Sequence, residues 1–127
     1  MIAVDTSALI AVILRQGQWQ ACDAALRDNR DIVISAGTVA EALIVAGRKA
    51  ISQEMVTLFE GFDFEIEPVT AFVARQVAIA YERWGKGNHP ARLNFGDCFA
   101  YELATRRACP LLFVGDDFAK TDVRRAF

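Results

Sequence analysis

The sequence is poor in the residues that hold together small disulfide-rich or zinc-bound domains. Cysteine occurs only three times, at Cys22, Cys98 and Cys109, and no two cysteines form a C-x-x-C pair. This scarcity argues against both a disulfide framework and a zinc knuckle. We expect the three cysteines to be buried as small hydrophobic side chains, which is how free cysteines usually behave.

Long apolar runs are also missing. The longest one near the N-terminus, residues 8–14, is far shorter than the ~20 residues of a membrane-spanning helix. No basic run precedes it, as a secretory signal would require. The sequence therefore predicts a soluble, cytoplasmic protein with no membrane partner.

An excess of positive charge is the third absence. The 127 residues include 14 Lys and Arg against 16 Asp and Glu, which gives a net charge of −2. This balance argues, by itself, against a protein that holds nucleic acid by basic charge alone. The 54% of hydrophobic residues excludes a disordered chain. The length fits one domain, residues 1–127, with a core of its own.

Short apolar runs alternate with longer helical patterns, and no repeat or Pro/Gly-rich linker divides them. Strands are predicted at 2–4, 32–34, 64–66 and 111–114, and helices at 7–14, 19–30, 39–48, 51–60, 71–84 and 98–108. This alternation predicts an α/β fold in three layers, with helices on both sides of a mainly parallel sheet of four to five strands. The runs 2–4 and 111–114 show no polar alternation, which predicts that both strands lie in the middle of the sheet.

Acidic residues stand where such a sheet would bind a ligand. Asp5 follows the first strand, Glu41 lies in the first turns of the helix after the second, and the pair Asp116-Asp117 follows the last. Asp97 opens the helix that leads to the last strand. Because ligands of open parallel sheets bind at the carboxyl ends of the strands, these acids are candidate site residues.

Each acid also has a purely local explanation. Asp5 and Asp97 are suitable N-caps, the segment from Thr38 to Glu41 has the T-x-x-E pattern of a capping box, and Asp116-Asp117 suits a turn. Four carboxylates at one sheet edge would nevertheless repel one another unless a cation lay between them. With oxygen ligands and no paired His or Cys, that cation would be Mg²⁺ or Mn²⁺ and not Zn²⁺. Such ions support phosphodiester hydrolysis.

At this point the sequence resembles the PIN-domain ribonucleases, specifically the VapC-type toxins of bacterial toxin–antitoxin pairs. The resemblance rests on four segments in order: residues 1–9 (MIAVDTSAL), 35–41 (SAGTVAE), 85–101 (GKGNHPARLNFGDCFAY) and 111–122 (LLFVGDDFAKTD). It implies a PIN-like fold whose metal-binding acids are Asp5, Glu41, Asp97 and Asp116, with Asp117 as the alternative to Asp116.

The resemblance also suggests secondary positions. Thr6 and Ser7 match places where a hydroxyl contacts metal or substrate, although Ser7 could simply cap the first helix. Asn94 is either a supporting amide or a loop residue. The hydroxyl residue that the family often carries two places before the fourth acid is replaced here by Val114.

The activity that the resemblance implies is metal-dependent endonucleolytic hydrolysis of RNA by water, which leaves a 5′-phosphate. Mg²⁺ or Mn²⁺ would be held by Asp5, Asp97 and Asp116. Glu41 would bind a second ion or orient the nucleophilic water. A VapB-like antitoxin and a homodimer are the implied protein partners, and the apolar helices at 51–60 and 71–84 are candidate surfaces for either.

Basic residues toward the C-terminus could guide RNA to the acids, or could be solvated helix faces. They are Arg83, Lys86, Arg92, Arg106, Arg107, Lys120, Arg124 and Arg125. Setting the four metal-binding acids aside turns the net charge of −2 into +2 for the rest of the chain. The charge balance therefore does not exclude a nucleic-acid substrate.

Two other functions stay open at this level. The first is a PIN-like module that has lost catalysis and only binds RNA or protein; the presence of all four acids argues against it. The second is a phosphatase with Asp5 as nucleophile. That chemistry usually needs a second acid two residues later, where this chain has Ser7.

Overall fold

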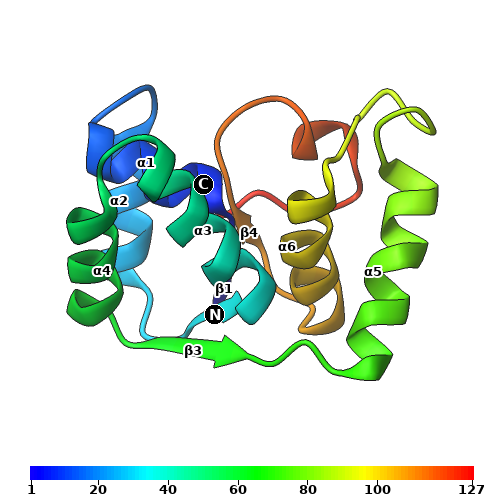
Figure 1. The fold of residues 1–127 in the computed structure, drawn as a ribbon, viewed down its shortest axis with the longest axis horizontal. Helices are drawn as coiled ribbons and strands as arrows, with labels where there is room; N and C mark the ends of the chain where they lie inside the picture. The colour runs from blue at the N-terminus through cyan, green and yellow to red at the C-terminus, as the bar shows by residue number, and fades with distance from the viewer.

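The computed structural model describes residues 1–127 and arranges six α-helices, a short 3₁₀ helix and four strands around one sheet (Figure 1). The elements are β1 (Ile2–Val4), α1 (Thr6–Leu14), α2 (Trp19–Asp28), β2 (Ile32–Ser35), α3 (Ala36–Arg48), α4 (Ser52–Gly61), β3 (Phe64–Glu67), α5 (Ala71–Trp84), α6 (Phe95–Arg106), β4 (Leu111–Leu112) and η1 (Phe118–Lys120). None of the helices combines the length and the hydropathy that a bilayer span requires.

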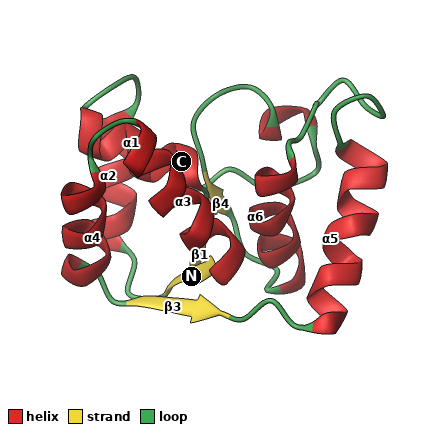
Figure 2. Ribbon diagram, in the orientation of Figure 1, coloured by secondary structure: helices red, strands yellow, loops and turns green.

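The sheet has the order β3-β2-β1-β4, and every neighbouring pair is parallel. Ile2 pairs with Ile32, and Ala3 lies between Val33 and Leu111. The α/β class and the parallel four-stranded sheet predicted from the sequence are confirmed. Figure 2 shows how small the sheet is compared with the helices around it.

The prediction that both unalternating strands lie mid-sheet is right for β1 and wrong for β4, which is the last strand on its side. The outer side of β4 is covered by the C-terminal segment. Leu111 donates its N–H to Arg124 O at 2.8 Å and accepts from Ala126 N at 3.0 Å. This cover explains why an edge strand can be as apolar as a central one.

Alternate strand residues face two hydrophobic clusters, one on each side of the sheet. Ala3, Val33 and Leu111 pack with residues of α5 and α6. Ile2, Val4, Ile32, Ile34 and Leu112 pack with residues of α1, α2, α3 and α4. Helices thus cover both faces, which is the predicted three-layer arrangement. The three cysteines are free and buried in these clusters, as expected.

Two helices begin earlier than the sequence predicts. α3 begins at Ala36, where Ser35 is the N-cap and its Oγ accepts from Gly37 N at 3.2 Å. α6 begins at Phe95 after its N-cap Asn94. A glycine lies in the first turn of each helix and obscured the boundary. Gly37 is needed there because a Cβ would lie 2.5 Å from the ring of Phe99, where α3 and α6 pack together.

Candidate active site

A cavity of about 410 Å³ opens beside the carboxyl end of β1. Its lining includes five of the residues predicted for the site, together with Val114: Asp5, Thr6, Ser7, Glu41 and Asp97. These side chains come from the β1–α1 junction, from α3 and from the first turn of α6. Residues far apart in sequence are therefore brought to one edge of the sheet, as predicted.

Asp5 caps helix α1 and is almost completely buried. Its Oδ2 accepts a hydrogen bond from Ser7 N at 3.0 Å. Its Oδ1 is buried without any partner. Burial, followed by the negative charge of Asp97, raises the pKa of Asp5 to about 7, against the hydrogen bonds from Ser7. The N-cap function predicted for Asp5 is confirmed, but it uses only one of the two oxygens.

Glu41 lies in the second turn of α3 and is held by Thr6. The Thr6 Oγ1 donates to Glu41 Oε1 at 2.6 Å. The capping box predicted for Thr38 and Glu41 is wrong, because α3 is capped by Ser35 and begins before Thr38. Thr38 is instead fully buried, and its Oγ1 has no hydrogen-bond partner. Glu41 is thus free to face the cavity.

Asp97 is the third residue of α6. The alternative that it is the N-cap of this helix is wrong, because Asn94 holds that position. Its Oδ2 accepts from Asn94 N at 2.8 Å. Burial, with the charges of Glu41 and Asp117, raises the pKa of Asp97 to about 6, against the hydrogen bond from Asn94. Two neighbouring carboxyl groups therefore have pKa values well above those of ordinary aspartates.

Asp116 and Asp117 are exposed in the bend between β4 and η1, and neither lines the cavity. The sequence prefers Asp116 as the fourth acid. In the structure the doublet acts on Asp97 through Asp117, whose charge contributes to the raised pKa of Asp97. The electrostatics thus favours Asp117 over Asp116 as the fourth acid, and the choice between these two residues stays a prediction.

Ser7 connects the site to the last strand. Its Oγ accepts from Val114 N at 3.1 Å. The alternative that Ser7 caps α1 is wrong, because Asp5 does so. Val114 takes the place of a hydroxyl residue, yet its backbone N–H still contacts a hydroxyl, that of Ser7. Asn94 contributes its backbone N–H to Asp97, so the predicted role of its side-chain amide stays a prediction.

Gly96 is a site residue that is not among those predicted from the sequence. A Cβ at this position would lie 1.6 Å from Glu41 Oε2. The position therefore has to be glycine for Glu41 to lie where it does. Its place directly before Asp97 was the available signal in the sequence.

The oxygen ligands fit a hard divalent ion in chemistry, although their present arrangement is not a finished coordination sphere. No three His, Cys, Asp or Glu side chains are grouped closely enough to hold an ion. Glu41 is directed to Thr6, and Asp97 to Asn94 N. The unpartnered Oδ1 of Asp5 and the raised pKa values of Asp5 and Asp97 are what a cation at this place would relieve.

Comparison with known proteins agrees with this geometry. Residues 2–124 match the family model of the PIN domain. Ribonuclease VapC28 of Mycobacterium tuberculosis (strain ATCC 25618 / H37Rv) is 44% identical over 128 residues, which cover 97% of this chain and 96% of the relative. Ribonuclease VapC42 of the same strain is 39% identical over 127 residues, 97% of each chain.

Solved structures share the fold. The crystal structure of Mycobacterium tuberculosis VapC20, described as a Sarcin-Ricin loop cleaving toxin, superposes with a TM-score of 0.79 at 16% identity, covering 97% of this chain and 96% of the other. A toxin–antitoxin complex from Klebsiella pneumoniae gives a TM-score of 0.71 at 19% identity, covering 100% of this chain and 98% of the other. The family match and the identities to the relatives lead to one conclusion: the chain belongs to the PIN-domain family and, within it, to the VapC ribonucleases.

Proposed function

We propose that this protein is the ribonuclease toxin of a VapBC-type toxin–antitoxin pair, and that it hydrolyses RNA phosphodiester bonds endonucleolytically with Mg²⁺ or Mn²⁺. The observation that carries the proposal is the buried, unpartnered Oδ1 of Asp5 in a cavity shared with Glu41 and Asp97. The names of the relatives, VapC ribonucleases, support RNA as the substrate.

Asp5 and Asp97 would hold the ion, with Asp117 or Asp116 completing the acidic set. A bound divalent ion supplies Lewis-acid stabilisation of the phosphate and lowers the pKa of water. Thr6 fixes one oxygen of Glu41, so that this carboxylate is positioned to accept a hydrogen bond from the attacking water. The backbone N–H of Asn94 donates a hydrogen bond to one oxygen of Asp97 and so fixes the orientation of this carboxylate.

A small VapB-like antitoxin is the proposed inhibitory partner, and the structural neighbour described as a toxin–antitoxin complex supports it. An acidic cavity suits a basic side chain of such a partner. Of the two helices predicted as candidate surfaces, α5 exposes Phe72 and Ile79 next to a hollow of about 370 Å³ against α6. This hollow is a candidate surface for the antitoxin or for a homodimer.

The test is cleavage of a panel of structured RNAs by the purified protein with Mg²⁺ or Mn²⁺, with and without EDTA, beside Asp97→Asn. We expect cleavage only by the wild-type protein with metal, and a loss of about 10³-fold or more in the variant, since several kcal/mol of charge stabilisation are removed. Asp116→Asn and Asp117→Asn, made singly, identify the fourth acid by the larger loss. Cleavage that resists EDTA, or an unchanged Asp97→Asn, would contradict the metal mechanism.

A further inference from the structure

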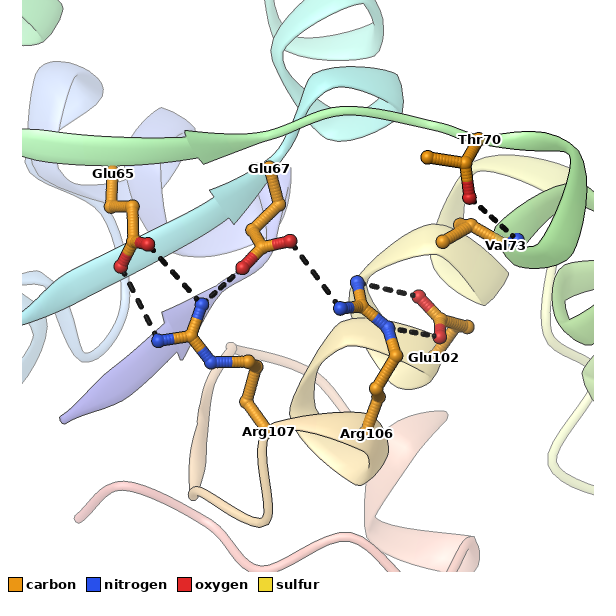
Figure 3. A network of polar contacts seen from close by, with 7 residues as sticks. All are labelled: Glu65, Glu67, Thr70, Val73, Glu102, Arg106 and Arg107. Atoms are coloured by element: carbon orange, nitrogen blue, oxygen red, sulfur yellow. Dashed lines mark hydrogen bonds and ion pairs between the residues drawn. The ribbon is translucent and has the colours of Figure 1, made fainter.

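The basic residues toward the C-terminus differ in whether their charge is already balanced. Arg106 contacts Glu102 and Glu67, and Arg107 contacts Glu67 and Glu65, at the C-terminal end of α6 (Figure 3). These two arginines are neutralised inside the protein. They are therefore poor candidates for contacts with RNA.

Three more arginines of this group have partners as well. Arg83 lies 3.7 Å from Asp122 and stacks over the ring of Trp84. Arg124 donates to Ala108 O at 3.1 Å, and Arg125 to a glutamine side chain and a backbone carbonyl. Their side chains are thus already engaged in contacts within the protein.

Lys86, Arg92 and Lys120 remain. All three are exposed, and none has a side-chain hydrogen bond or an ion pair in the structure. Lys86 and Arg92 belong to the loop between α5 and α6, residues 85–93, which we call the basic loop. Lys120 ends η1, which follows the Asp116-Asp117 bend. In Figure 1 the basic loop lies at the upper end of the molecule and leads into the start of α6, whose first turn contains Asp97.

The basic loop is anchored by buried and hydrogen-bonded residues. Lys86 N donates to Leu93 O at 2.9 Å, and Leu93 N to Trp84 O at 3.1 Å. Ala91 and Leu93 are fully buried on either side of Arg92, which has a left-handed φ of 55°. A residue with a Cβ adopts this conformation only where its surroundings enforce it. Arg92 is therefore held outward by a fixed backbone.

Phe95 begins α6 two residues after the basic loop and is the most exposed large hydrophobic residue of the chain, at 71%. Its ring lies 5.0 Å from that of Phe99 in an edge-to-face arrangement. Phe95 is three residues after Arg92 and two before Asp97, so the Arg92 and Phe95 Cα atoms are within about 11 Å of each other. An aromatic ring is thus packed at one edge on Phe99, open to solvent, and attached at a sequence position between the unpaired Arg92 and the active-site residue Asp97.

We propose that Lys86, Arg92 and Phe95 form a binding surface for a single-stranded stretch of RNA beside the scissile phosphate. A nucleobase stacks on Phe95, and the neighbouring phosphates contact Lys86 and Arg92. This inference rests on the proposed function. The acids of the cavity repel a polyanion, and free cations next to them offset this repulsion. Aromatic rings among cations are the usual surface for unpaired nucleotides.

The surroundings favour RNA over a protein partner at this place. The hollow on the basic loop, about 550 Å³, is lined by Lys86, Asn88, His89 and other loop residues, and no hydrophobic side chain contributes to it. The hollow between α5 and α6 is half hydrophobic in its lining, which suits a protein partner better. A basic antitoxin side chain would also be repelled by Lys86 and Arg92.

The test is the binding of a short, fluorescently labelled single-stranded RNA, measured by anisotropy at several KCl concentrations. It uses Asp97→Asn protein without divalent ions, so that no RNA is cleaved. Lys86→Gln with Arg92→Gln should weaken binding about tenfold or more and reduce the steepness of the salt dependence by about 1.4, at about 0.7 per phosphate contact. Phe95→Ala should weaken binding about fivefold to a hundredfold and leave the salt dependence unchanged, whereas Phe95→Trp should retain binding.

The matched control removes the same charge from elsewhere. Arg30 precedes β2 and Arg75 lies in the first turns of α5, both exposed and without ion pairs. In Figure 1 the segment before β2 and the start of α5 lie at the lower end of the molecule, opposite the basic loop. Arg30→Gln with Arg75→Gln should leave binding and its salt dependence within about twofold. Equal losses in the two double variants would overturn the proposal, because they would indicate net charge only. A Phe95→Ala variant that loses a dimer by light scattering while retaining RNA affinity would assign Phe95 to a contact between copies of the chain and would also overturn it.

Cleavage kinetics separate this inference from the proposed function. With metal and otherwise wild-type protein, Lys86→Gln/Arg92→Gln and Phe95→Ala should raise KM with little change in kcat. If the wild-type protein cleaves RNA and both variants keep its KM, the binding surface is wrong and the proposed function stands. If the wild-type protein binds RNA as described but cleaves none, the binding surface stands and the proposed function is wrong.

Discussion

The two ends of helix α6 differ in whether their charged side chains have partners of opposite charge. At its first turn, Asp97 lies near the negative charges of Glu41 and Asp117, and burial with these charges raises its pKa to about 6. At its last turn, Arg106 and Arg107 lie among Glu65, Glu67 and Glu102, and every charge has an opposite partner (Figure 3). One helix thus joins an unbalanced cluster to a balanced one.

The difference shows which cluster serves the fold and which serves a ligand. The hydrogen bonds that Arg106 donates to Glu102 raise the pKa of Arg106, and those that Arg107 donates to Glu65 raise the pKa of Arg107, so these pairs stabilise the charged forms. The acids at the other end destabilise one another until a cation or a proton arrives. A protein retains such an arrangement where it binds or reacts. Loss of charge should therefore have opposite consequences at the two ends.

The largest expected effect is that of Asp5→Asn. Cleavage should fall by about 10³-fold or more, because a metal ligand is lost. Stability should rise. The pKa of Asp5 is raised to about 7 from 3.8, so the folded protein binds more protons than the unfolded chain between these values, and its free energy of unfolding falls as pH increases from about 4 to about 7. In EDTA at pH 8 the variant should be about 1–3 kcal/mol more stable than the wild-type protein.

Urea denaturation at pH 4 and at pH 8 measures this effect. The stability difference should be much smaller at pH 4, where the folded state is protonated and the unfolded chain is about half protonated. Asparagine is as good an N-cap as aspartate, so the helix start is preserved. A variant that is less stable than the wild-type protein at pH 8 would show that Asp5 is structural and not a strained ligand.

Gly96→Ala should have the next largest effect. The new Cβ would meet Glu41 Oε2 at 1.6 Å, so Glu41 has to move away from Thr6. A misplacement of about 1 Å lowers cleavage by about 10²-fold. The control is Gly61→Ala at the end of α4, where a Cβ meets nothing within 4 Å. Equal activities of the two variants would show that the position of Glu41 is unimportant.

Arg106→Gln tests the balanced end, and its effect is the smallest. Glu102 is 5% exposed and would lose its closest hydrogen-bond partner. We expect a loss of about 1–3 kcal/mol in the free energy of unfolding, the usual effect of an unsatisfied buried group. The rate of RNA cleavage should not change. Reduced kcat in a folded Arg106→Gln protein would contradict the division of α6 into a structural end and a functional end.

The sequence predicted the strands, the parallel sheet and the acids at its edge, because apolar runs and strand-end acids are local signals. It did not predict that β4 lies at the edge, because the covering segment near Arg125 has no strand pattern. It left a capping box open for Thr38 and Glu41 beside the metal-site prediction, and only the start of α3 at Ala36, capped by Ser35, excludes it. The sequence also did not show which basic residues lack an acidic partner. The ion pairs that decide this join residues about 40 positions apart, such as Arg107 and Glu67.

The most direct test of the central claim is the calorimetric titration of the protein with Mn²⁺ in buffers of different ionisation enthalpy. Asp5 and Asp97, with pKa values raised to about 7 and about 6, carry protons at pH 5.5 that a bound ion has to displace. We predict Mn²⁺ binding with release of one to two protons at pH 5.5, little release at pH 8, and no binding by Asp97→Asn. Binding without proton release at pH 5.5, or undiminished binding by Asp97→Asn, would contradict the assignment of these acids to a metal site.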